Sequence, residues 1–226
     1  MKNNFQMLSQ IKSCIQYVSD LHLEKGFKRL IKPSRPTLLL GGDIGHPRDN
    51  DYKNFLLDMA DVFDNVCILT GNHEYIGMQN SVNECDDRIE NICVMRNNLH
   101  FLQKKTFKIG DNLHIAGCTF WSLNPICKRQ YHLDHKEWIE NILETNPNND
   151  YVIATHHAPL FQCVNKKYKS NQNYFASDQS ELIKNNNNLK AWIHGHTHTN
   201  KDFMVYGKWI ISNQYGSYEN PLFKYN

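Results

Sequence analysis

Short apolar runs recur along the chain, and each ends in glycine or polar residues. Five of them stand out, at residues 14–24, 37–45, 66–74, 151–159 and 190–198. Runs of about four apolar residues bounded by turn signals are typical of strands that are buried on both faces of a sheet. The pattern therefore predicts five buried strands.

Segments with helical spacing separate several of these runs. Residues 51–63 carry their large apolar side chains on one stripe, and residues 80–95 and 136–144 show a similar pattern. Two hairpins are expected, one at residues 107–121 that turns at Gly110 and Asp111, and one at residues 202–213 that turns near Gly207. Strands that alternate with helices predict an α/β fold whose mixed sheets are covered by helices.

Composition places the chain among ordinary globular proteins. Its 226 residues are 40% hydrophobic and 21% charged, which suits one domain with a full core and excludes disorder. No linker or internal repeat divides it, so we expect a single domain over residues 1–226. The net charge of +2 is too small to indicate nucleic-acid binding by itself.

The cysteines and the N-terminus favour a cytoplasmic location. Seven cysteines are scattered without a CxxC pair, which predicts reduced thiols rather than a disulfide framework. The first residues lack the apolar segment of a signal peptide. No apolar stretch approaches the ~18 residues that a membrane-spanning helix needs, so no membrane partner is expected.

The last apolar run contains three alternating histidines in the sequence WIHGHTHT, namely His194, His196 and His198. On a regular strand they would share one face, where they could simply line a solvated edge. Gly195 argues against a regular strand, because a glycine there indicates a tight bend or a close approach of the backbone. Since imidazole is the commonest metal ligand, we expect a metal site.

Candidate ligands in fact follow every one of the five runs. They are Asp20 and His22, then Asp43, then Asn72 and His73, then His156 and His157, and finally His196 and His198. In α/β sheets, functional sites form in the crevice at the carboxyl ends of the strands. Five such ends in order predict that their polar groups converge at one rim.

These residues form ordered motifs that resemble the calcineurin-like metallophosphoesterases. The motifs are D-x-H, G-D, G-N-H-[DE], a later histidine and G-H-x-H, here at residues 20–22, 42–43, 71–74, 156 and 195–198. The resemblance covers about residues 14–199. It implies two mixed β-sheets packed as a sandwich flanked by helices, and a metal-dependent phosphoesterase acting on a phosphomonoester or phosphodiester.

The resemblance also implies two metal sites that share one ligand, Asp43. One site would comprise Asp20, His22, Asp43 and His198, and the other Asp43, Asn72, His156 and His196. Imidazole and oxygen ligands without thiolate suit Mn, Fe, Zn or Co, and Mn is favoured here. Two cations about 3.5–4 Å apart would activate a bridging hydroxide and absorb the oxyanion charge.

His73 is the remaining motif histidine, and the resemblance makes it a catalytic residue that protonates the leaving oxygen. The alternative is a hydrogen bond beside the site. Many relatives place an acidic residue three positions after the bridging aspartate, where this chain has His46. An imidazole cannot raise its neighbour's basicity, so a less basic His73 is expected. His46 either faces the substrate or is an ordinary loop residue, and Arg48 either binds a phosphate or is solvated.

Other features leave alternatives open. The sequence NKKYKSNQNYF at residues 165–175 mixes lysines with aromatics, so it either grips a phosphate backbone and bases or is a solvated loop. His157 and His194 are expected to be neighbours of the ligands. A phosphorylated small molecule or nucleotide is the expected substrate, with nucleic acid as an alternative. A catalytically weak protein scaffold is the competing function, although the complete motif set argues against it.

Overall fold

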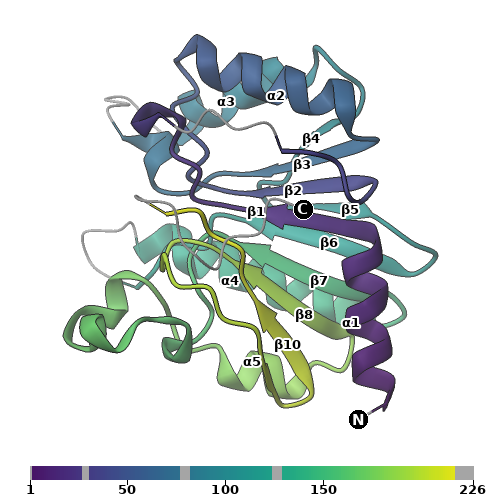
Figure 1. The fold of residues 1–226 in the computed structure, drawn as a ribbon. Helices are drawn as coiled ribbons and strands as arrows, with labels where there is room; N and C mark the ends of the chain where they lie inside the picture. Colours follow the sequence, from purple (N-terminus) through teal and green to yellow (C-terminus); the bar gives the residue numbers. More distant parts are fainter. Residues whose placement is uncertain (1, 27–30, 77–81, 124–128, 217–226) are drawn as a thin grey trace.

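Two β-sheets form the centre of the protein in a computed structural model, which describes residues 2–26, 31–76, 82–123 and 129–216 (Figure 1). The four-stranded sheet has the order β1-β2-β3-β4 and contains β1 (Ile15–Val18), β2 (Thr37–Gly41), β3 (Asn65–Leu69) and β4 (Leu99–Phe101). All its pairs are parallel. Each strand is short, and β2 is buried along its whole length.

The six-stranded sheet has the order β5-β6-β7-β8-β10-β9. Its strands are β5 (Lys105–Lys108), β6 (Leu113–Cys118), β7 (Asp150–Thr155), β8 (Leu189–His194), β9 (Phe203–Val205) and β10 (Lys208–Ile211). The four inner strands are parallel, whereas β5 and β9 pair antiparallel at the two edges. The two predicted hairpins, β5-β6 and β9-β10, therefore supply the antiparallel edges.

Within the described residues, five α-helices accompany the sheets: α1 (Lys2–Cys14), α2 (Asn50–Val62), α3 (Val82–Cys93), α4 (Arg129–Thr145) and α5 (Ser180–Asn185). Helices α2 and α3 cover the outer face of the four-stranded sheet, and α4 and α5 cover the outer face of the six-stranded sheet (Figure 1). Helix α1 lies beside the sandwich, where Ile11 packs into the apolar layer between the sheets.

Alternation along the strands explains the layers. In β2, Leu38 and Leu40 face the helices, whereas Leu39 faces the other sheet. In β7, Ile153 faces the helices and Val152 faces the other sheet. Both faces of these strands are buried, as continuous apolar runs predict. Three apolar layers therefore hold a helix-sheet-sheet-helix sandwich together.

The predicted α/β sandwich is confirmed, with local differences. The smaller sheet is parallel throughout rather than mixed, and α4 begins at Arg129, ahead of the expected start. Helix α1 and strand β4 are not anticipated by the sequence. The apolar residues of α1 are diluted by asparagine, glutamine and lysine, so only its packing against the inter-sheet layer defines it.

Two further observations apply to the residues that the structure describes. The six cysteines within them are free thiols, five of them buried. None of the helices in the described ranges has the length and apolar character that crossing a membrane requires.

Candidate metal centre

Loops that follow parallel strands run side by side beyond the sheets. In the four-stranded sheet, the amide of Asp20 donates to the carbonyl of Gly42 at 3.0 Å, and the amide of His22 donates to that of Asp43 at 3.0 Å. In the other sheet, the amide of Gly195 donates to the carbonyl of His156 at 2.9 Å. Backbone hydrogen bonds thus join the loop after β1 to the loop after β2. They also join the loop after β7 to the loop after β8.

A ring nitrogen joins the two pairs of loops. Nδ1 of His156, after β7, donates to the carbonyl of Gly41 in β2 at 3.0 Å. This bond crosses from one sheet to the other and leaves Nε2 of His156 facing the space between the loops. Metal-ligating histidines commonly use one ring nitrogen in this way, because it fixes the tautomer and the ring orientation.

Three groups of donor atoms result among the described residues, each with all atoms within 4.8 Å of one another. One of them comprises His22, Glu24 and His73, and the other two, which we call the first and second clusters, share Asp43. The first cluster comprises Asp20, His22, Asp43 and His198, and the second comprises Asp43, His156 and His196. Asn72 adds its Oδ1 atom 3.3 Å from Nε2 of His156. The structure therefore brings together all seven residues that the sequence nominated as ligands.

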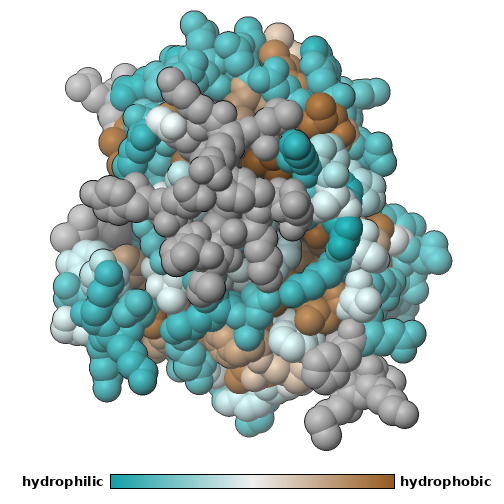
Figure 2. All heavy atoms as spheres, in the orientation of Figure 1, coloured by the Kyte–Doolittle hydropathy of each residue, from teal (hydrophilic) through white to brown (hydrophobic). Residues whose placement is uncertain are grey.

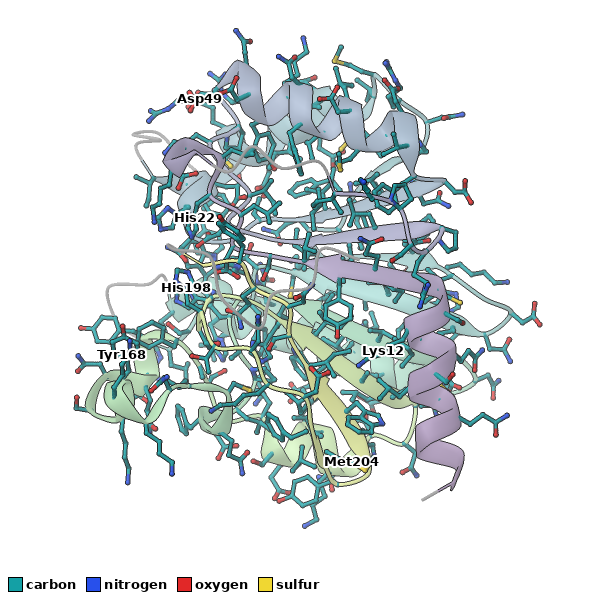
Figure 3. All side chains as sticks on the ribbon, viewed as in Figure 1. Lys12, His22, Asp49, Tyr168, His198 and Met204 are labelled. Carbon is teal, nitrogen blue, oxygen red and sulfur yellow. The ribbon has the colours of Figure 1, made fainter. Side chains whose placement is uncertain are left out.

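Distances in the first cluster leave room for an ion. Nε2 of His22 lies 3.5 Å from Nε2 of His198 and 4.0 Å from Oδ2 of Asp43. Nε2 of His198 lies 3.2 Å from Oδ1 of Asp20. Figure 3 shows His22 and His198 together on the side of the molecule where these strands end. Several potential ligand atoms thus surround one point at separations that would allow them to bind the same ion.

The backbone at these positions is strained. Five of the seven residues have positive φ angles in the left-handed region: Asp20 (56°), His22 (53°), Asp43 (52°), His196 (65°) and His198 (46°). Residues other than glycine adopt this region rarely, and each instance costs of order 1–3 kcal/mol. Such strain persists where the surrounding structure imposes it, and here it turns the side chains of three loops toward a common centre.

Glycines allow these loops to approach closely. A Cβ atom on Gly71 would collide with Oδ1 of Asp43, and one on Gly42 would lie 2.6 Å from Nδ1 of His156. At Gly195, a Cβ would lie 2.8 Å from Oδ2 of Asp20. The expected close approach at Gly195 is therefore present, and the left-handed turn comes one residue later, at His196.

The charged groups within the clusters shift one another's pKa values. Burial opposes ionisation of Asp43, but the neighbouring His156 holds its pKa well below the usual range. Burial likewise disfavours a charged His156, yet Asp43 raises the pKa of that imidazole to about 9. The pKa of Asp20 falls to about 2, against its burial, because of the hydrogen bond and charge of His198. Both carboxylates are therefore ionised at neutral pH.

Glu74 holds two of the motif loops together from behind. Its carboxylate accepts backbone hydrogen bonds from Asp43 at 3.0 Å, Ile44 at 2.8 Å and Gly71 at 2.7 Å. Burial and the charge of Asp43 raise the pKa of Glu74 to about 7, whereas the backbone donors lower it. The acidic position of the G-N-H-[DE] motif is therefore explained as a brace between the loops after β2 and β3.

A sequence model described as calcineurin-like phosphoesterase matches residues 15–200. The chain belongs to this family. An uncharacterized protein of Acanthamoeba polyphaga mimivirus is 29% identical over 255 residues, which cover 89% of this chain and 90% of that protein. The phosphoesterase motifs and the convergent loops thus describe one and the same site.

Solved structures share the fold of this calcineurin-like phosphoesterase at low sequence identity. The phosphopantetheinyl hydrolase of Mycobacterium tuberculosis has a TM-score of 0.70 at 15% identity, covering 90% of this chain and 89% of that one. A putative 5'-nucleotidase of Staphylococcus aureus has a TM-score of 0.54 at 16% identity, covering 88% and 48%. The GAP50 anchor of the Plasmodium inner membrane complex has a TM-score of 0.55 at 13% identity, covering 88% and 70%.

His73 lies beside the clusters with a carboxylate partner that the sequence analysis missed. Its backbone amide donates to Oδ1 of Asp43 at 2.8 Å, and its Nδ1 lies 3.2 Å from Oε1 of Glu24. The hydrogen bond with Glu24 raises the pKa of His73. Glu24 therefore supplies a carboxylate that position 46 lacks. The expectation that His73 is less basic than in relatives with an acidic residue at position 46 stays a prediction.

His46 and Arg48 are placed differently from the cluster residues. Nδ1 of His46 donates to the backbone carbonyl of His73 at 3.1 Å, so this imidazole supports the loop rather than the ring of its neighbour. Arg48 lies exposed on the loop before α2. A substrate role for either residue stays a prediction.

His157 and His194 are buried neighbours of the clusters, as expected. Burial holds the pKa of His157 well below its ordinary value, and its ring centroid lies 4.1 Å from that of His196. Burial also lowers the pKa of His194 to about 4, and its Nδ1 donates to the carbonyl of Gly195. Both imidazoles are neutral at pH 7 and pack beside the proposed ligands.

Proposed function

We propose that this protein is a metal-dependent phosphoesterase that hydrolyses a phosphomonoester or phosphodiester at a dinuclear centre. The observation that carries the proposal is the pair of donor clusters that share Asp43. Donors from five separate strand ends meet there, several on strained backbone. Strained backbone tends to cluster at functional sites, and five of the eight described non-glycine residues with positive φ are donors of these clusters.

The residues present fit two divalent cations. Asp20, His22, Asp43 and His198 would hold one, and Asp43, Asn72, His156 and His196 the other. Carboxylate, carboxamide and imidazole donors without thiolate suit Mn, Fe, Zn or Co, with Mn our first choice. When bound, two such cations lower the pKa of an attacking water and stabilise the charge that develops on the phosphoryl oxygens.

His73 would act as the general acid of this reaction. Its Nε2 lies 4.0 Å from Oδ2 of Asp43, close to both clusters, while Nδ1 faces Glu24. Because the hydrogen bond with Glu24 raises the pKa of His73, the imidazole keeps its proton to a higher pH than a free histidine would. It can then donate that proton to the departing oxygen, a contribution worth typically 10²–10⁴ in rate.

A scaffold function is the second candidate, favoured by the likeness to the Plasmodium anchor protein. The fold alone does not decide between the two, since one fold can carry many functions. The complete donor set argues for chemistry, because a scaffold has no need for buried, unsaturated ligands on strained backbone. Neighbours that are a phosphopantetheinyl hydrolase and a 5'-nucleotidase support a phosphorylated small molecule or nucleotide as substrate.

The test combines metal content with hydrolysis. We expect the Mn-loaded protein to hold about two equivalents by mass spectrometry and to hydrolyse nitrophenyl phosphate or its diester. Asp43→Asn should reduce both metal content and turnover further than His22→Gln, because only Asp43 belongs to both clusters. Asp49→Asn, a change on the exposed loop labelled in Figure 3, is the matched control and should alter neither.

Metal content at background in the wild-type protein would contradict the dinuclear proposal. Full metal content without turnover on any ester would instead favour the scaffold function. Equal activity of Asp43→Asn and His22→Gln would show that Asp43 does not bridge.

A further inference from the structure

One wall beside the second cluster is formed by residues 166–175, which we name the basic-aromatic segment. Nε2 of His196 donates to the carbonyl of Tyr174 at 3.2 Å, and the ring centroids of Phe175 and His196 lie 5.4 Å apart. The carbonyl of Phe175 accepts from the amide of Ala158 at 3.1 Å, two residues beyond His156. The segment is thus fixed directly against two loops of the candidate centre.

Aromatic rings lead outward from the centre along this segment. The ring of Tyr168 stacks on that of Phe175, with centroids 5.2 Å apart and planes inclined by 27°. Phe175 in turn contacts His196, so each ring is one step further from the clusters. Tyr168 is 38% exposed and Tyr174 is 41% exposed. Figure 3 shows Tyr168 on the same side of the molecule as His22 and His198.

The same segment carries concentrated positive charge. Lys166, Lys167 and Lys169 are exposed, and no acidic residue occurs between positions 165 and 175. Nζ of Lys167 lies 4.7 Å from the ring centroid of Tyr168. Among the residues that the structure describes, no carboxylate forms an ion pair with these three lysines. Figure 2 shows a pale to strongly hydrophilic surface over this part of the molecule.

We propose that the basic-aromatic segment is a subsite for nucleobase-bearing phosphoesters. The inference rests on the proposed phosphoesterase function and names its substrate class. The reacting phosphate would lie at the clusters, the base would stack on the exposed tyrosines, and the lysines would neutralise a further phosphate. Aromatic platforms beside unpaired cations are what bind bases and phosphates without sequence preference.

The experiment compares esters that differ only in the base. Mn-loaded protein is assayed for phosphate release from adenosine monophosphate and from ribose 5-phosphate. Adenosine diphosphate, whose terminal phosphate leaves by hydrolysis of an anhydride, is assayed separately to test the effect of a further phosphate. The protein is also assayed for cleavage of a short single-stranded oligonucleotide and of its abasic counterpart, which separates free nucleotides from nucleic acid as the source of the base. We expect kcat/KM to be higher for the base-bearing member of each pair.

Two variants then test the segment itself. Tyr168→Ala should reduce the preference for base-bearing over base-free esters by about tenfold, which is the usual loss for one stacked base. Replacing Lys167 and Lys169 together by alanine should raise KM for the diphosphate or the oligonucleotide more than for the monophosphate. If Tyr168→Ala left the ratio of kcat/KM for base-bearing over base-free esters unchanged, the subsite proposal would be overturned.

Controls lie at the opposite end of the six-stranded sheet. Tyr206 is 51% exposed in the turn before β10, and because β10 runs parallel to β8, this turn lies away from the carboxyl ends. Lys108 is exposed at the end of β5, beside the turn that leads into the start of β6. Tyr206→Ala and Lys108→Ala should leave every ratio unchanged.

A binding measurement separates failure of the subsite from failure of the proposed chemistry. Calorimetric titration of adenosine diphosphate into the metal-free wild type, Tyr168→Ala and Tyr206→Ala reports the segment without turnover. Tyrosine-dependent binding without hydrolysis of any ester would contradict the phosphoesterase and leave the subsite standing. Hydrolysis with no base preference, and no tyrosine-dependent binding, would contradict the subsite and leave the phosphoesterase function standing. The absence of both binding and hydrolysis would contradict both proposals.

Discussion

The Oε1 atom of Glu24 lies 3.2 Å from Nδ1 of His73 and orients the imidazole that we propose as general acid. The same atom accepts a hydrogen bond from Nδ1 of His22 at 2.9 Å. One carboxylate therefore serves a proposed metal ligand and a proposed acid. Mutation of residues that hold ligands in this way typically costs about 10–100-fold in metal affinity or activity.

Replacing Glu24 should weaken protonation of the leaving group. Glu24→Gln keeps the side chain's size but removes the charge that raises the pKa of His73. We expect a loss of roughly 10–100-fold in kcat for alkyl phosphates and a smaller loss for nitrophenyl phosphate. The reason is that nitrophenolate leaves without needing a proton. Steady-state kinetics on a series of leaving groups provides the measurement.

His46→Asp is the comparison for this prediction. In the wild type, the ring of His46 donates a hydrogen bond to the backbone carbonyl of His73 and not to its imidazole. A carboxylate at position 46 should therefore not compensate for Glu24→Gln. Restoration of the alkyl phosphate rate in the double variant would show that His46, rather than Glu24, occupies the decisive position. An equal loss for all leaving groups would show that Glu24 acts only through His22.

The residues of the candidate centre could be predicted because strand ends are readable in sequence. Apolar runs mark buried strands, and parallel strands end at one rim, so ligand-type residues after each run must converge. Asp43 and His156 follow strands of different sheets, β2 and β7, and Nε2 of His156 lies 3.3 Å from Oδ1 of Asp43. Local patterns of this kind need no knowledge of how loops fold.

Features that depend on long-range packing could not be predicted. Glu24 reaches His73 because the left-handed backbone at His22 leads into a short 3-10 turn, Leu23–Lys25. The basic-aromatic segment reaches His196 because of the bridge between Ala158 and Ala176. Helix α1 is defined by the layer it packs against. A carboxylate two positions after a ligand histidine was the available signal for Glu24, since ligands commonly have such partners.

The brace formed by Glu74 should be sensitive to loss of one acceptor. Glu74→Gln keeps one acceptor oxygen but replaces the other with an NH2 group, so the oxygens that accept from Asp43, Ile44 and Gly71 can no longer both accept. We expect the free energy of unfolding to fall by about 1–3 kcal/mol, the penalty for an unsatisfied buried donor. Urea unfolding measures this loss, with Glu137→Gln on the exposed face of α4 as the control. An unchanged unfolding midpoint would show that the loops do not need the brace.

A methyl group on Gly71 should disrupt the candidate centre through space alone. The Cβ atom of Gly71→Ala would collide with Oδ1 of Asp43 and lie 2.6 Å from Cε1 of His156. We expect loss of metal binding and a lower melting temperature. In Gly110→Ala the new atom would lie 3.5 Å from Cβ of Leu113, an ordinary contact, so this variant is the matched control. Mn-dependent thermal shifts of both variants test the prediction, and a full shift in Gly71→Ala would contradict it.

Asp86 should make stability depend on pH outside the candidate centre. Tyr75 donates its hydroxyl hydrogen to Oδ1 of Asp86 at 2.8 Å, and burial raises the pKa of that carboxyl to about 6. An unfolded aspartate has a pKa of about 3.9, so between these values the folded state binds the proton more strongly. The stabilisation is therefore complete below about pH 4 and is lost as the pH rises through about 6.

Asp86→Asn should remove this dependence, because the amide keeps an oxygen to accept from Tyr75 and carries no charge. We expect the variant to be more stable than the wild type at pH 8 but not at pH 4, as measured by urea unfolding at both values. Asp58→Asn on the exposed face of α2 is the control for a simple change of net charge. If Asp58→Asn and Asp86→Asn changed the unfolding free energy equally at pH 8, the effect would come from overall charge. Burial of the Asp86 carboxyl would then not be its cause.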